Sequence, residues 1–252
     1  MLKQTFFFLG IMGILLSGLP VEASDRMAEV NKFTTMLESD SLKTRIDAAK
    51  RITRSGLTDP GLFNMIQEKL LTGSAHIGNS KHVDEMSWMC KALASSGNME
   101  YLETLTNIGT TSTSEKLKRY AKQSAEQLSV HAERNRLLAD ETNMDTSLSP
   151  EVNRYIIMLK SNDPVLKRDA AKSIYRSHFT EEKLYDVVSD ELLKGYPLTS
   201  SNDRNYTDSM AWMCKALGAS GMKKYRSTLT EVLEKSNSEK LKQSARKSLR
   251  NL

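Results

Sequence analysis

The sequence has few cysteines, which cross-link many small exported domains through disulfides, and few aromatic residues. Of 252 residues, only Cys90 and Cys214 are cysteines, and aromatic residues make up 6%. The two cysteines occupy equivalent positions in an internal repeat. With packed helix layers about 8–10 Å apart, their alpha carbons should lie farther apart than the roughly 4.4–6.8 Å that a disulfide spans. We therefore expect two buried free thiols that pack as small apolar groups.

Common catalytic and cofactor motifs are also absent. The chain has no Gly-x-Ser-x-Gly elbow, phosphate-binding glycine loop, Cys-x-x-Cys pair or His-Glu-x-x-His helix. His76, His82 and Asp84 lie close together, but their spacing matches no zinc pattern, and Tyr206 replaces His82 in the second repeat. We expect no enzyme, no cofactor and no metal site.

One long apolar run occurs, and it lies at the N-terminus. It extends from Gln4 to Val21 without a charge, follows Lys3, and ends near Pro20 and Ala23. This layout predicts a signal peptide over residues 1–23 and an exported chain, periplasmic or secreted. An uncleaved anchor is the alternative, because about 17–25 apolar residues span a bilayer. We expect no transmembrane segment after cleavage.

An internal duplication dominates the remaining sequence. Five segments of the first half return in the same order in the second, offset by 122 to 124 residues. The paired segments are 29–33 with 151–155, 47–50 with 169–172, 70–73 with 192–195, 86–93 with 210–217, and 114–118 with 238–242. The chain is therefore a tandem duplication.

Each copy shows apolar residues at helical spacing and no stretch that alternates like a strand. Prolines after Asp59 and Asp163 are typical of helix starts, and Ser112 with Glu115 has the spacing of a capping box. We predict six helices per copy, arranged as three hairpins. The expected units are 24–131 and 151–252, joined by a linker or ordered crossing at 132–150.

The segments 42–52 and 165–174 place a basic residue before paired alanines and an aliphatic residue. They resemble the second helix of a HEAT repeat. The resemblance implies an all-α fold, an α-α superhelix of the HEAT-like (armadillo-like) solenoid type built from a tandem duplication of a three-hairpin unit. Such proteins work chiefly as binding scaffolds, and the resemblance points to no particular member.

The segment Met-x-Trp-Met-Cys-Lys-Ala-Leu is the best preserved between the copies. On a helix, an acid, an indole and a lysine share one face, and second helices line the concave side of a solenoid. The candidate binding residues are Asp84, Trp88, Lys91, Asp208, Trp212 and Lys215. A competing interpretation is that each tryptophan packs against the neighbouring hairpin while the charges satisfy one another.

Charge is unevenly distributed between the copies. Residues 24–147 hold 16 basic and 17 acidic side chains, whereas residues 148–252 hold 19 and 13. Our first hypothesis is a non-enzymatic scaffold that binds a protein or peptide partner. The alternative is a binder of an acidic envelope ligand or anionic membrane surface through the basic second unit, and export disfavours nucleic acid. The residues proposed for that alternative are Lys240, Lys242, Arg246, Lys247 and Arg250.

Overall fold

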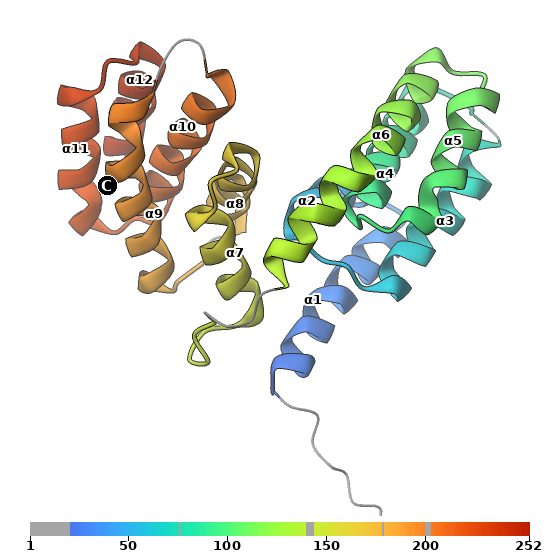
Figure 1. Ribbon diagram of the computed structural model, residues 1–252, viewed down its shortest axis with the longest axis horizontal. Coiled ribbons are helices and arrows are strands. Elements are labelled where there is room, and N and C mark those ends of the chain that lie inside the picture. The colour runs from blue at the N-terminus through green and yellow to red at the C-terminus, as the bar shows by residue number, and fades with distance from the viewer. Residues whose placement is uncertain (1–20, 76, 140–143, 178, 200–202) are drawn as a thin grey trace, which may run out of the picture.

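The computed structural model describes residues 21–75, 77–139, 144–177, 179–199 and 203–252. The fold is all-α, a HEAT-like α-α superhelix in which a three-hairpin unit occurs twice in tandem (Figure 1). No strand occurs among the described residues. The helices of the first unit are α1 (Val21–Glu38), α2 (Leu42–Ser55), α3 (Pro60–Ser74), α4 (Ser80–Ser95), α5 (Leu102–Thr111) and α6 (Glu115–Leu138). Those of the second are α7 (Pro150–Lys160), α8 (Pro164–Ser177), α9 (Glu182–Gly195), α10 (Arg204–Ala219), α11 (Arg226–Lys235) and α12 (Glu239–Leu249).

Local capping explains where the helices begin. The Asp59 carboxylate accepts the Leu62 N–H at 2.9 Å beside Pro60, and such a cap satisfies an N–H that has no partner within the helix. At α6 the cap is Ser114, which accepts the Leu117 N–H. The predicted capping box from Ser112 is therefore wrong by two residues, because Ser112 instead accepts the Ser114 N–H in the turn before the helix.

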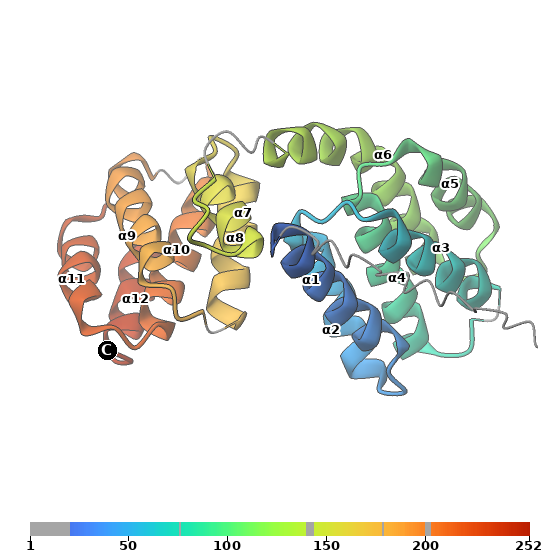
Figure 2. The same ribbon diagram turned by 90° about the horizontal axis from the view of Figure 1, so that it is seen from below.

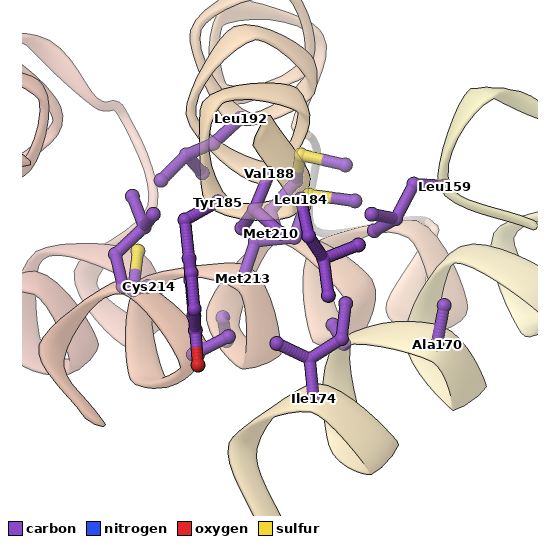
Figure 3. Packing of buried hydrophobic residues seen from close by; sticks show 14 of the residues in the cluster. Leu159, Ala170, Ile174, Leu184, Tyr185, Val188, Leu192, Met210, Met213 and Cys214 are labelled. Carbon is purple, nitrogen blue, oxygen red and sulfur yellow. The ribbon is translucent and has the colours of Figure 1, made fainter. Parts of the chain in front are cut away.

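The helices form two layers. Even-numbered helices pack side by side, as do odd-numbered helices, and each hairpin contributes one helix to each layer (Figure 2). Each unit has its own apolar core between the layers. In the second unit, Tyr185 and Val188 of α9 lie against Met210 and Met213 of α10 (Figure 3).

The hairpins are not stacked in chain order. The first hairpin of one unit packs on the first hairpin of the other, with α1 against α7 and α2 against α8 (Figure 1). Equivalent surfaces meet, which is the pattern of an approximate twofold relation. A solenoid stacked in chain order would instead place the third hairpin of the first unit on the first hairpin of the second. The even-numbered helices nevertheless form one continuous layer, in the spatial order α6, α4, α2, α8, α10, α12, which we call the even-helix layer.

Helix α6 makes this order possible. It runs to Leu138, so residues 132–138 of the predicted linker 132–150 are helical. Its last turns cross the ends of α4 and α2: the Asn135 amide donates to the carbonyls of Ser95 and Ser96 at 3.0 and 2.8 Å, and Leu138 joins the core of the second unit. The 24 residues of α6 span about 36 Å, enough to return the chain to the first hairpin.

Buried polar groups hold the two units together. Glu29 of α1 and Arg154 of α7 form an ion pair at 2.5 Å, with side chains 4% and 5% exposed, and Arg154 also donates to the Ser55 carbonyl. Burial raises the pKa of the Glu29 carboxyl even though Arg154 opposes the shift. The contact between units is thus specified partly by charge, since an unpaired charge there would be costly.

The first 20 residues, which include most of the expected signal peptide, lie outside the described residues. From residue 26 on, where the burial of its side chains is described, α1 buries Glu29, Phe33 and Leu37. None of the described helices has both the length and the apolar composition needed to cross a bilayer.

Candidate binding surface

Trp88 lies half-buried on the even-helix layer between two lysines. The Lys50 ammonium of α2 lies 5.1 Å from the indole centroid, and that of Lys91 lies 4.3 Å away. Lys91 also lies 4.3 Å from the ring of Tyr120 on α6. Ammonium groups at these distances are attracted by the aromatic quadrupole, which fixes the lysines over the rings.

Trp212 repeats this arrangement in the second unit. Lys172 of α8 lies 5.1 Å from its indole centroid and Lys215 lies 3.8 Å away, while Tyr175 meets the indole edge-to-face at 5.7 Å. Burial lowers the pKa of both lysines. The two tryptophans thus occupy equivalent places on one layer, each between a lysine of its own helix and a lysine of the preceding even-numbered helix.

The predicted acids point elsewhere. Asp84 pairs with Lys116 of α6, and Asp208 pairs with Lys240 of α12 at 3.0 Å. Neither acid pairs with Lys91 or Lys215. The predicted acid, indole and lysine therefore share a helix face as expected, but the acids join neighbouring helices while the lysines lie against the indoles.

Sequence reasoning missed four residues of this surface, Lys50, Lys172, Tyr120 and Tyr175. Lys50 and Lys172 are equivalent in the repeat, and each follows the paired alanines, so their repetition was a usable signal. Tyr120 and Tyr175 have no such signal, because Ser244 and Thr53 stand at the equivalent positions.

The five predicted basic residues in and just after α12 do not form one patch. Lys240 and Lys247 lie near enough to Lys215 to lower its pKa, after the larger effect of burial. Lys242 pairs with Glu239 at 3.4 Å, and Arg246 and Arg250 are exposed. Only two of the five therefore adjoin the Trp212 site.

His82 lies in a polar cleft of the first unit. Its Nε2 is 2.8 Å from the Gly73 carbonyl oxygen, and its Nδ1 is 3.4 Å from the buried Glu85 carboxylate, which Arg45 also contacts. A cavity of about 480 Å³ adjoins this cluster. His76 lies outside the described residues, and among those described no three His, Cys, Asp or Glu side chains gather in a way that could hold a metal ion.

Both cysteines are buried and unbridged. Burial raises the pKa of the Cys90 thiol to about 12 and that of Cys214 further still. The thiolate is the reactive form of cysteine, so both side chains act here as apolar packing groups.

Comparison of the sequence with family models and with curated proteins found no match. Comparison of the structure with solved structures found human deoxyhypusine hydroxylase in complex with glycerol, at 10% identity and a TM-score of 0.36, covering 92% of this chain and 91% of that chain. It also found two engineered proteins, both at 16% identity. One has a TM-score of 0.30 and covers 88% of this chain and 96% of that chain, and the other has a TM-score of 0.31 and covers 88% and 98%.

These comparisons correct one expectation. We had expected no enzyme because catalytic motifs are missing, yet a helical chain that matches over most of its length is named as a hydroxylase. Missing motifs therefore do not decide against an enzyme. At 10% identity the similarity transfers no activity to this chain.

Proposed function

We propose that this chain is an interaction module that binds a protein or peptide partner on the even-helix layer, anchored by Trp88 and Trp212. The observation that carries the proposal is the repeated geometry of the two sites. Each tryptophan is half-buried between two lysines, and neither indole is sealed in a core. Tryptophan is over-represented among residues that dominate binding energy.

The arrangement on one layer strengthens the proposal. Because α2 packs on α8, the two sites belong to one surface rather than to two separate lobes. A partner that binds both sites gains affinity, since binding at the second site becomes intramolecular once the partner is held at the first.

The test is selection of peptides from a displayed library on the full chain. We expect selected peptides to bind wild type and to lose about tenfold or more in affinity to each of Trp88→Ala and Trp212→Ala, a typical loss for an anchoring side chain. Glu103→Ala, an exposed residue of α5 in the odd-numbered layer, is the control. If the selected peptides bind both tryptophan variants as they bind wild type, the proposal is wrong.

A second candidate is binding of an acidic envelope ligand or an anionic membrane surface through the second unit. The observation in its favour is that Lys240 and Lys247 lie near Lys215 on the Trp212 side. Charge reversal at these two lysines should abolish sedimentation with anionic vesicles, while reversal at Arg246 and Arg250 should have less effect. Equal losses from both pairs would contradict a defined site.

We also propose that the chain is exported and cleaved after Ala23. Cleavage there would leave Glu29, Phe33 and Leu37, the buried residues of α1, in the mature protein. The intact mass of the chain purified from the cell envelope tests this, because an uncleaved anchor would retain residues 1–23.

A further inference from the structure

A cavity of about 260 Å³ lies between the two units, next to the Trp88 site. Helices α2, α4, α6 and α8 line it, so it exists only because the chain returns to the first hairpin. The side chains on which its chemistry depends are Lys91, Ser124, Gln127, Arg134, Arg168 and one carboxylate, Asp169. Its volume is below the roughly 300–1,000 Å³ of pockets that bind drug-sized ligands. A cavity of this size suits one or two side chains.

Two donors on its wall lack a hydrogen-bond acceptor within the described chain. The Ser124 hydroxyl is buried without a hydrogen bond. Lys91 contacts the rings of Trp88 and Tyr120 but no carboxylate. Buried polar groups are almost always hydrogen-bonded in folded proteins, so an unpartnered hydroxyl in the same cavity wall as a lysine indicates a place for an acceptor.

The charge of the wall favours an anion. Arg134 pairs with Asp163 at 2.7 Å and Arg168 with Asp169 at 3.2 Å, which leaves the Lys91 ammonium uncompensated. His131 adds no charge at neutral pH, because burial, and then Arg134, lower its pKa to about 4. A carboxylate would supply both the negative charge and the acceptors.

We propose that this inter-unit cavity binds an acidic side chain of a peptide whose neighbouring residues contact Trp88. Lys91 connects the two places, since its ammonium lies on the indole and its side chain lines the cavity. The inference rests on the proposed function and specifies the partner as acidic at this position.

The experiment uses the full chain with Trp212→Phe, so that Trp88 is the single tryptophan, and titrates it with a hexaglutamate peptide. We expect a saturable change in indole fluorescence that weakens as salt screens the charges. A hexaglutamine peptide of equal length should give none. If it gives the same change, the proposed charge recognition is wrong.

Two variants on α6 provide the matched test. Gln127 is exposed and lines the cavity, whereas Ser129 is exposed and does not line it. In the Trp212→Phe background, Gln127→Glu should weaken hexaglutamate binding about tenfold or more, because like charges in contact are strongly unfavourable. Ser129→Glu should change binding less than about twofold. Equal effects would overturn the inference, and thermal melts verify that both variants fold.

Two further outcomes separate this inference from the proposed function. If library peptides depend on Trp88 and Trp212 but carry no acidic residue, the proposed function stands and this inference is wrong. If free glutarate binds as tightly as hexaglutamate and Gln127→Glu weakens both equally, the occupant is a small dicarboxylate and the peptide inference is overturned.

Discussion

The first and second units carry the same tryptophan between the same two lysines, yet their last helices differ. Helix α6 has 24 residues and α12 has 11. The additional turns of α6 cover the end of α4 and carry the chain back to the first hairpin. The difference shows that one elongated helix can change which hairpins become neighbours while leaving the repeated core intact.

The largest expected difference in lost stability is between substitutions of Arg154 and of Lys32, which occupy equivalent positions in the repeat. Arg154 is buried with Glu29, whereas Lys32 is exposed. Arg154→Met should cost about 3–5 kcal/mol, because it leaves a buried carboxylate unpaired. Lys32→Met should change stability by less than about 0.5 kcal/mol.

Urea denaturation measures both values. Combining Arg154→Met with Glu29→Met should restore much of the loss, because it removes both charges. Similar unfolding midpoints for the two single variants would contradict a charge-specified contact between units.

Leucines of the repeated core should behave alike. Leu93 and Leu217 are each fully buried, so replacement of either by alanine should cost about 2–5 kcal/mol by leaving a cavity. A thermal melt of each variant checks this. A cost in only one unit would indicate that the cores are not equivalent.

His131 lies in the part of α6 that has no counterpart in α12. Its pKa falls from 6.5 to about 4 on folding, chiefly because of burial. The unfolded chain therefore takes up the proton first, and stability that is present above pH 6.5 is lost as pH falls towards 4, by at most about 3 kcal/mol. His131→Gln should flatten this dependence in urea midpoints measured between pH 7.5 and 4.5. An unchanged slope would show that the imidazole is solvated.

Gly97 and Gly221 should differ because only Gly97 lies against α6. Both have left-handed backbone, with φ of 67° and 70°, so alanine should cost about 1–2 kcal/mol at either. At Gly97 a Cβ would also lie 2.5 Å from the Ala132 backbone nitrogen of α6, whereas at Gly221 nothing lies within 4 Å. Gly97→Ala should therefore cost about 1–3 kcal/mol more. Equal melting temperatures of the two variants would mean that α6 shifts at little energetic cost to accommodate the added Cβ at position 97.

Much of the candidate site could be predicted because it repeats. Trp88 and Trp212 stand out in a self-comparison, and helical periodicity places Lys91 and Lys215 beside them. The lysines from α2 and α8 were harder to identify, since their approach to the indoles depends on how helices pack. The pairing of Asp84 with Lys116 depends likewise on the neighbouring helix rather than on spacing within α4.

The inter-unit cavity could not have been predicted. It combines α4 and α6 with α8, which meet only because α6 continues past the expected boundary at residue 131. Nothing in the local sequence distinguishes a helix that ends at 131 from one that crosses back over its own unit.

By itself, the sequence determined the duplication, the twelve described helices and the two apolar cores, because helical periodicity and capping act over a few residues. The tertiary structure decided which hairpins adjoin, and thereby placed both tryptophans on one layer. The reason is that contacts such as Glu29 with Arg154 join residues far apart in the chain, and their pairing depends on the path of α6 rather than on any local pattern.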